Sequence, residues 1–287
     1  MLTVHVKSSL KIDPSRTTML RRKFVADMQR RFVKLGRDIY TLIVTNDVFG
    51  FEDPSPFALQ ANRQEFKFQT DAAKVASYRK WLQGEIDTGI LTVDGIGEPW
   101  TNKYVGAAYK KGVDRAYTDV SKVKGFKDLS RDQFTQIAFG QPELQSKIEL
   151  IYTRTYNELK GVTDAMSQQM SRALANGLVA GQGPKVIARE LQKVNEKITK
   201  TRALVIARTE TIHAHAEGQL DSFEWLGVEK VDIMAEVLTA GDERVCTICL
   251  DAASEGPMLI EEARGIIPLH PNCRCAWKPV INTNRKK

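Results

Sequence analysis

The sequence predicts a mostly α-helical protein with a small C-terminal α+β part, in which long helices are followed by a short antiparallel sheet. Three observations predict this fold class. Apolar residues recur at three- and four-residue steps along most of the chain, as in helices with one buried face. Near residue 230 the apolar period changes to two, which is typical of strands. All four cysteines lie in the last 42 of the 287 residues, beside the predicted strands.

Length and composition are those of a globular protein. The chain can form one large domain or two modest ones, and 42% of its residues are hydrophobic while 27% are charged. Its apolar runs are too short for a membrane span, and its first residues show no secretion signal. We therefore expect no membrane association and a reducing cytoplasm, where clustered cysteines are more often metal ligands than disulfides.

The N-terminal segment, residues 1–45, carries the whole charge excess of the chain. It holds ten Lys or Arg residues against three Asp residues, whereas basic and acidic side chains balance in the other 242 residues. Such a local excess indicates an anionic partner for this segment. We expect a short strand or arm at residues 2–6, then a helix with Asp13 as its cap and Pro14 in its first position.

Apolar residues lie on one face of this first helix, and basic residues lie mostly off that face. The apolar positions are Leu20, Phe24, Met28, Phe32, Leu35 and Ile39. The basic positions are Arg21, Arg22, Lys23, Arg30, Arg31, Lys34 and Arg37. Two interpretations are equally open at this point: a solvated surface helix docked on its own core, or a helix that binds another protein or nucleic acid.

The remaining elements follow from turn signals and apolar periods. Turn formers at 46–66 predict a loop, and helices are expected near 70–88, 101–123, 143–178 and 199–226. Strands are predicted within residues 230–240 and 275–281. We expect four regions: a basic arm and helix at 1–45, a helical region with loops at 46–142, a long-helix core at 143–230, and a two-stranded Cys/His region at 231–287.

The Cys/His region has the spacing of a metal site. Cys246 and Cys249 form a C-x2-C turn, and after 20 residues His270, Cys273 and Cys275 follow. Two such pairs suit tetrahedral Zn²⁺, so the fold class includes a C-terminal zinc knuckle. Five candidates compete for four positions. The preferred set uses Cys273 as the fourth ligand, and the set with Cys275 in its place is nearly as good, because the two point the same way on a strand.

The alternative to a metal site is a small core with four buried free cysteines. If Zn²⁺ binds, a closed site with four protein ligands is structural and not catalytic. We expect it to replace the hydrophobic core that a C-terminal piece of about 57 residues struggles to build.

The order of these elements resembles the phage head morphogenesis domain of the Mu F type, found in minor head proteins of tailed phages. The resemblance covers roughly residues 140–280 and rests on three motifs: "ARTE" in a long helix, "DERVCTIC" after a strand, and "PLHPNCRC". The matching positions are Ala207, Arg208, Thr209 and Glu210; Asp242, Arg244, Cys246 and Cys249; and Pro268, His270, Pro271, Asn272, Cys273, Arg274 and Cys275.

The resemblance implies a structural virion component in few copies, with no enzymatic activity. Such a protein joins the prohead beside the portal, in the capsid interior or at the neck, and influences packaging or ejection of DNA. Its partners would be the portal protein, other head proteins and packaged DNA, and no small-molecule substrate is expected. A basic arm fits that place, since both the portal and the DNA offer anionic surfaces.

Three other functions are alternatives for this sequence. A nuclease of the HNH kind needs a histidine base beside the knuckle, but no histidine lies between Cys249 and His270. An ADP-ribosyltransferase-like domain would need an Arg…Ser-Thr-Ser…Glu set, and the sequence contains no convincing match to it. A plain zinc-supported DNA-binding protein remains the third alternative. Glu210, His213 and Glu217 share one helix face and could form an acid–base or metal site, but a solvated face is the better interpretation.

Charged residues flank both the long helix and the knuckle. Arg208 and Glu210 stand on the helix, whereas Asp242 and Arg244 precede the first cysteine. We expect at least one ion pair between these two groups, which would orient the knuckle on the helix.

Overall fold

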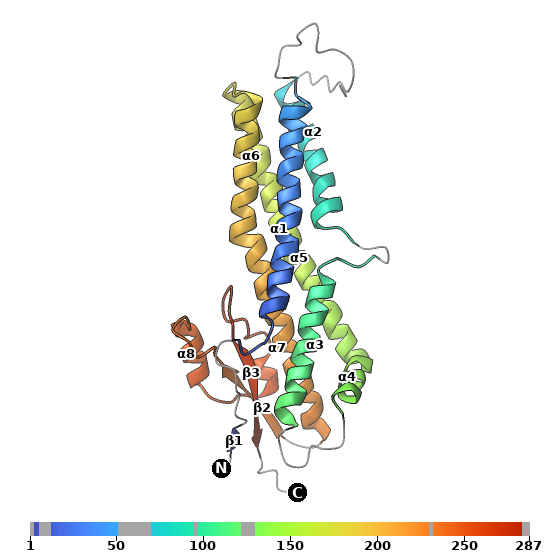
Figure 1. Cartoon of the computed structure of the whole chain (residues 1–287), viewed down its shortest axis with the longest axis vertical. Coiled ribbons are helices and arrows are strands. Elements are labelled where there is room, and N and C mark those ends of the chain that lie inside the picture. Colours follow the sequence, from blue (N-terminus) through green and yellow to red (C-terminus); the bar gives the residue numbers. More distant parts are fainter. Residues whose placement is uncertain are drawn as a thin grey trace. The chain divides into compact units, whose positions relative to one another are not determined.

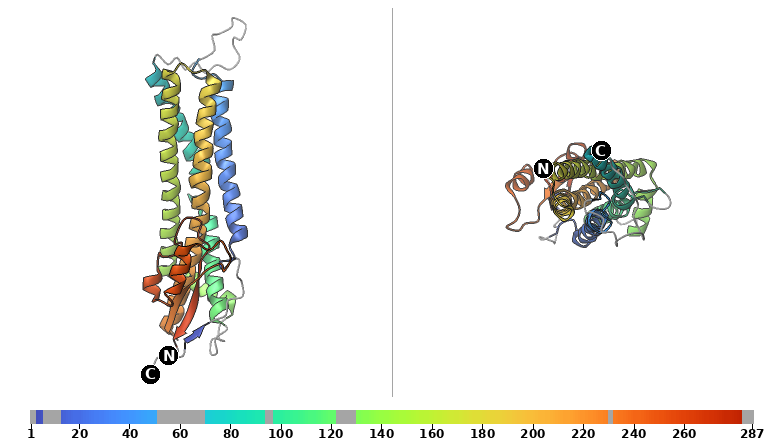
Figure 2. Two further views of the ribbon diagram at one scale, coloured as in Figure 1. Left: turned by 90° about the vertical axis from the view of Figure 1, so that its left-hand side faces the viewer. Right: turned by 90° about the horizontal axis from the view of Figure 1, so that it is seen from above.

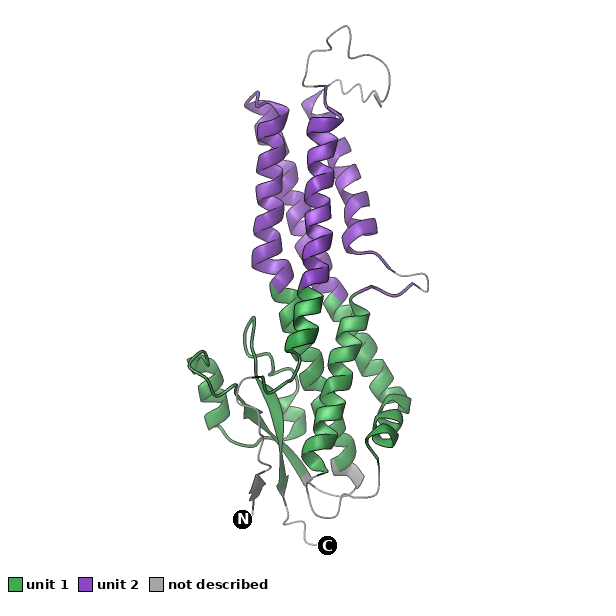
Figure 3. Cartoon of the chain, viewed as in Figure 1, with its two compact units in different colours: residues 1–25, 101–155, 205–287 green, residues 26–100, 156–204 purple. Residues whose placement is uncertain are grey.

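The computed structural model of the chain describes residues 3–5, 13–50, 70–93, 97–121, 130–229 and 232–282. The chain forms two compact units, each assembled from segments that are far apart in the sequence (Figure 3). Unit 1 comprises residues 1–25, 101–155 and 205–287, and unit 2 comprises residues 26–100 and 156–204. The predicted region boundaries at 45, 142 and 230 therefore do not separate the units.

Unit 2 is built from helices. Its elements are the later part of α1 (Thr18–Tyr40), the π-helical turn η1 (Thr41–Thr45), α2 (Asp71–Glu85), the π-helical turn η2 (Ile86–Ile90), the later part of α5 (Pro142–Val179), α6 (Pro184–Ile198) and the π-helical turn η3 (Thr199–Ala203). Figure 1 shows these helices side by side. Tyr78 of α2 donates its hydroxyl to the sulfur of Met170 in α5, 3.6 Å away, and both side chains are buried.

Helix α1 is a core helix of unit 2 and not a separable arm. Five of the six predicted apolar positions are buried, with Met28, Phe32 and Ile39 at 0% exposure, and Leu20 is partly buried. Asn195 Nδ2 of α6 donates to the carbonyl of Phe32 over 2.8 Å, and Gln192 Nε2 donates to that of Gly36 over 3.1 Å. The first interpretation of this helix, docked on its own core, is confirmed for its apolar face. The predicted region 1–45 is divided between the two units at residue 25.

The start of α1 differs from the prediction by one turn. Asp13, Pro14, Ser15 and Arg16 form a turn in which the Arg16 amide donates to the Asp13 carbonyl over 3.1 Å. The helix therefore begins at Thr18, after this turn. Asp13 still caps the helix, because its carboxylate accepts hydrogen bonds from the Thr18 amide at 2.9 Å and from Ser15 Oγ at 2.8 Å.

Unit 1 combines helices with a sheet. Its helices are the first turns of α1, α3 (Asn102–Val120), α4 (Arg131–Gly140), the first part of α5, α7 (Leu204–Glu229), and the short α8 (Thr247–Ser254) and α9 (Ile260–Ala263). Apolar side chains of α7 lie in the core of unit 1, where Ile212, Leu220 and Phe223 all have 0% exposure. The predicted helix start at 199 is instead the π-helical turn η3.

The sheet has three antiparallel strands and lies against α7 (Figures 1 and 2). Strand β3 (Ala276–Asn282) lies between β1 (Thr3–His5) and β2 (Asp232–Leu238), so the N-terminal strand adds a third member to the predicted pair. Trp277 of β3 has 0% exposure and pairs in register with Val237 of β2. Gln219 of α7 accepts from the Trp277 amide at 3.0 Å and donates to its carbonyl at 2.8 Å.

The sheet therefore shares one hydrophobic core with the helices of unit 1. Buried side chains of α3, α4, α7, β2 and β3 belong to a single apolar cluster, which also includes Cys249, Cys273 and Cys275. The C-terminal region therefore does not build its core alone, because α7 and α3 contribute to it.

Two glycines set the distance between α3 and α7. A Cβ atom on Gly112 would lie 2.1 Å from the backbone oxygen of His215, and one on Gly218 would lie 2.4 Å from that of Tyr109. Both contacts are to backbone atoms, so no side-chain rotation relieves them. The two helices approach this closely only because both positions lack a side chain.

Gly112→Ala should lower the free energy of unfolding by roughly 1–3 kcal/mol or more, because the added methyl group forces the two backbones apart. Gly161→Ala is the matched control. Gly161 lies on an exposed face of α5 with no atom within 4 Å of an added Cβ. The control should be neutral or stabilising by up to about 1 kcal/mol, since alanine favours helix. Urea denaturation of both variants checks this, and equal midpoints would contradict it.

Candidate metal centre

The five predicted ligands converge in unit 1 from two short segments. Cys246 is the N-terminal cap residue of α8 and Cys249 lies in its first turn. His270, Cys273 and Cys275 precede β3. The amide of Cys273 donates to the carbonyl of His270 over 3.1 Å, which closes a tight turn. Within it Pro271 fixes the first central position and Asn272 has a φ of 63°, a left-handed value that asparagine tolerates.

The donor atoms lie in two overlapping groups of three, and the following separations within these groups are close to those of a tetrahedral metal site. His270 Nε2 is 3.3 Å from Cys246 Sγ and 3.2 Å from Cys249 Sγ, and Cys249 Sγ is 3.9 Å from Cys273 Sγ. Bonds of about 2.3 Å to sulfur and 2.0 Å to nitrogen give tetrahedron edges of about 3.8 Å between two thiolates and about 3.5 Å between thiolate and imidazole. Cys249 belongs to both groups of three ligands that come together, one with Cys246 and His270 and one with Cys273 and Cys275.

The imidazole of His270 is oriented for this role. Its Nδ1 lies 2.9 Å from the carbonyl oxygen of Pro271, so Nδ1 carries the proton and donates it. Nε2 is then the unprotonated nitrogen, and it faces the two sulfur atoms of the C-x2-C turn. A hydrogen bond of this kind from the second ring nitrogen is the usual support of a metal-binding histidine.

The three buried thiols cannot all ionise together. Burial raises the pKa of Cys249 to about 12. A hydrogen bond from Cys275 lowers the pKa of Cys273 to about 5, and the same contact raises the pKa of Cys275 far above its ordinary value. One thiolate is thus favoured at the expense of its neighbours, and a bound divalent cation would supply the charge that allows the others to ionise.

An ion pair connects the two ligand segments. Asp242 lies shortly before Cys246, and both its oxygens accept from Arg274, at 2.7 and 2.6 Å. Arg244 adds a contact of 3.1 Å to the same carboxylate. The hydrogen bond from Arg274, which stands between Cys273 and Cys275, holds the pKa of Asp242 well below its usual range. This two-pronged contact fixes the spacing between the segments as well as the charge.

The predicted ion pair between the helix residues and the residues before the knuckle does not form. Arg208 instead donates to Asn272 Oδ1 over 3.4 Å. Glu210 lies 3.3 Å from Nε of Arg154 on α5 and accepts from Thr155 at 3.3 Å. Asp242 and Arg244 pair with each other, and Arg274 is the partner that the prediction missed, because it lies next to the ligands themselves.

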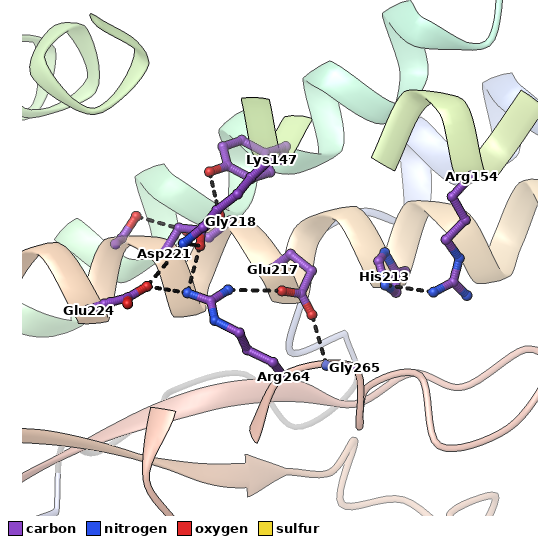
Figure 4. Close-up of polar contacts among 11 residues, drawn as sticks. Lys147, Arg154, His213, Glu217, Gly218, Asp221, Glu224, Arg264 and Gly265 are labelled. Carbon is purple, nitrogen blue, oxygen red and sulfur yellow. Dashed lines mark hydrogen bonds and ion pairs between the residues drawn. The ribbon is translucent and has the colours of Figure 1, made fainter. Parts of the chain in front are cut away.

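A second set of ion pairs joins the loop before His270 to α7 (Figure 4). Arg264 lies 3.1 Å from Glu217 and 2.8 Å from Asp221, and it also contacts Glu224. The Gly265 amide donates to Glu217 over 3.1 Å. Because these three acids recur at four- and three-residue steps, they lie on one face of α7 and can hold a single guanidinium.

The same acids are held from the other side. Lys147 of α5 lies 2.9 Å from Asp221 and 3.1 Å from Glu224, and the Tyr109 hydroxyl donates to Asp221 over 2.7 Å. The Asp221 side chain is 1% exposed. The sequence analysis missed this network and predicted a solvated face for Glu217.

The two histidines of α7 are buried and neutral. Burial, and then the charge of Arg154, lowers the pKa of His213 to about 4, and Arg154 donates to its Nε2 over 2.9 Å. Burial, and then Arg115, lowers the pKa of His215 to about 3. Neither imidazole reaches solvent as a nuclease base would have to. Among the described residues, the Cys/His groups are the sets of three possible metal ligands that come together.

Arg264→Met should lower the free energy of unfolding by about 2–3 kcal/mol, because it leaves Glu217 on α7 without its cation and leaves Asp221 with only Lys147 of its two cations. The matched control is Arg244→Met, which removes a side chain that is 75% exposed from a carboxylate still held by Arg274. The control should cost less than about 1 kcal/mol. Urea unfolding followed by tryptophan fluorescence measures both, and a control as costly as Arg264→Met would refute the role of Arg264.

A known protein family matches the part of the chain that contains the predicted ligands. Residues 168–278 match the model of a family described as Phage Mu protein F like protein. The match begins within α5 and runs through α7 and all five predicted ligands into β3. No curated protein matches the chain. No solved structure matches it either. The resemblance seen in the sequence is thus confirmed over residues 168–278, which are similar to the Mu protein F-like family.

Proposed function

We propose that this protein is a minor head protein of a tailed phage that joins the prohead near the portal and influences packaging or ejection of DNA. The family match over residues 168–278 carries the proposal, since the family indicates a role in phage head morphogenesis and other head proteins as partners. Such a protein acts as a structural component of the virion. In the part of the chain that the structure describes, no helix has the length and apolar character to cross a bilayer.

The Cys/His cluster is proposed to bind one structural Zn²⁺ through Cys246, Cys249, His270 and Cys273. The 3.9 Å separation of the Cys249 and Cys273 sulfurs favours Cys273 as the fourth ligand. The amide of Cys275 donates to Cys273 Sγ over 3.5 Å, and backbone amides commonly donate in this way to a metal-bound thiolate. Four protein ligands leave no open position, so the ion would fasten the loop and perform no chemistry.

Protein purified without chelator should contain about one zinc ion per chain by elemental analysis. Cys273→Ser and His270→Ala should lose the ion, whereas the matched variant Cys275→Ser should keep it. Cobalt substitution should give the intense visible bands of a tetrahedral thiolate site in wild type and Cys275→Ser alike. Zinc-free wild-type protein would refute the site, and retention by Cys273→Ser with loss by Cys275→Ser would reassign the fourth ligand.

The exposed cations of α1 are proposed to contact an anionic partner in the head, the portal or the packaged DNA. Two of the seven predicted residues are not available for this. Arg21 is 14% exposed and pairs with Asp13 at 3.4 Å, and Arg31 donates to the Gly89 carbonyl over 2.6 Å and covers the Trp100 ring. The remaining cations are Arg22, Lys23, Arg30, Lys34 and Arg37, all exposed.

The exposed cations are weakly held within the chain. Arg30 pairs with Asp27 and Lys34 lies 2.7 Å from Asp38, but their side chains are 77% and 69% exposed. Surface pairs of this kind contribute little to stability, so a partner's anionic groups can replace these acids at small cost. Arg30, Lys34 and Arg37 follow one another at four- and three-residue steps and therefore share a face of α1.

The triple variant Arg30→Gln, Lys34→Gln, Arg37→Gln should enter proheads about tenfold less well than wild type. Three lost surface contacts of about 0.5 kcal/mol each give this factor. The matched control changes Lys185, Arg189 and Lys193 of α6 to Gln, which removes the same charge from exposed positions of the same unit. Quantitative blotting of purified heads checks both, with circular dichroism confirming the fold. Equal incorporation of variant and wild type would contradict the proposed face.

A further inference from the structure

A small polar cavity of about 150 Å³ lies in unit 1, where the turn before α1 meets α3 and the start of α4. Four cationic side chains line it, and they come from three separate segments: Arg16 from the turn, Lys111 and Arg115 from α3, and Arg131 from α4. A single carboxylate, that of Asp114, lines it as well. Three of the cations are exposed, whereas Arg115 is buried.

The positive charge of this cavity is only partly compensated. Asp114 is shared, because Lys110 and Arg131 each approach it at 3.4 Å and the Thr135 hydroxyl donates to it over 3.1 Å. Among the described residues, the side chains of Arg16 and Lys111 form no hydrogen bond or ion pair. Like charges that converge without a counter-charge repel one another, so an anion in the cavity would be stabilised.

The fold holds these cations in place. Arg16 has a left-handed φ of 53°, and its amide closes the turn on the Asp13 carbonyl at 3.1 Å. Such a conformation is uncommon for a residue with a side chain and persists only where the surroundings fix it. Arg115 is fixed by its buried ion pair with Asp119, at 2.5 Å. The backbone at Arg16 and the side chain of Arg115 are therefore held by the fold.

The hydroxyl groups at the cavity are already engaged. Thr118 Oγ1 donates to the Asp114 carbonyl over 2.8 Å, and Ser15 Oγ donates to the Asp13 carboxylate over 2.8 Å. Recognition of a ligand would therefore come from the cations. Guanidinium groups match the planar pairs of oxygens on a phosphate, and an ammonium adds a point charge. Cations from three segments can each reach a different oxygen of a tetrahedral anion. A carboxylate has two oxygens in one plane and suits this arrangement less well.

We infer that this cavity binds a phosphate group, and specifically a backbone phosphate of DNA. Its volume of about 150 Å³ is below the roughly 300–1,000 Å³ of typical small-molecule pockets, which suits one phosphate group and not a nucleoside. The phosphate would enter while sugar and base stay outside, so binding would not depend on sequence. The choice of DNA as the source of the phosphate rests on the proposed function, whereas the affinity for phosphate itself does not.

The test uses the full-length variant Lys111→Gln, Arg131→Gln. Both residues are exposed, so the fold should persist, and circular dichroism checks this. The matched control is Lys185→Gln, Arg189→Gln, with the same charge change away from the cavity. Calorimetric titration with inorganic phosphate at constant ionic strength should show at least tenfold weaker binding by the variant than by the control. Phosphate binding equal to that of the control overturns the inference, and so does an acetate affinity that equals the phosphate affinity.

A second arm identifies the source of the phosphate. Fluorescence anisotropy of a labelled DNA duplex is measured over a range of salt concentrations, and the slope of log affinity against log salt should fall by about 0.9 for the phosphate contact that the variant loses. Two results overturn the assignment to DNA. One is a slope that the variant leaves unchanged, and the other is a variant that loses binding to poly-glutamate but not to DNA. The variant on α1 leaves this cavity intact, so its incorporation into heads reports on the proposed function separately.

Discussion

Helix α7 carries polar side chains into the core of unit 1, and neighbouring elements of that unit pair two of them, Gln219 and Asp221. Asp221 and Gln219 are almost fully buried, and an unpaired group at either position would cost several kcal/mol. Their partners come from four neighbouring segments. Asp221 contacts Lys147 of α5, Tyr109 of α3 and Arg264 of the loop before His270, and Gln219 contacts the Trp277 backbone of β3. The close approach of α3 and α7 at Gly112 and Gly218 is what brings Tyr109 within reach.

A zinc knuckle often both docks a sheet and holds the ligand loop, but here different contacts do each. The sheet is docked by Gln219 and by the buried Trp277, and neither contact involves a metal ligand. The loop that carries the ligands is held at two points, by Arg264 on α7 and by the Asp242–Arg274 pair. The ligands therefore converge while the thiols still compete for ionisation, and a metal ion would complete the loop without being needed for the core.

Local sequence patterns predicted what depends on local structure. The helix period gave the buried face of α1 and of α7, and the C-x2-C and H-x2-C spacings gave the two ligand turns. Partners that depend on tertiary packing were not predictable: the acids at 217, 221 and 224 have the same spacing whether they meet solvent or Arg264. A basic amphipathic helix is likewise the same pattern in a separate arm and in a core helix such as α1. The two units were missed because single helices continue from one into the other.

We expect α7 to hold the sheet whether or not the proposed zinc ion is bound, whereas the ion would order only the loop between the strands. Amide hydrogen exchange of the full-length protein, compared with and without zinc, tests this most directly. Amides of β2 and β3, including that of Trp277, should stay protected in both states, and protection over residues 243–275 should fall when zinc is removed. Loss of protection in β3 to the same extent as in the loop would contradict the account.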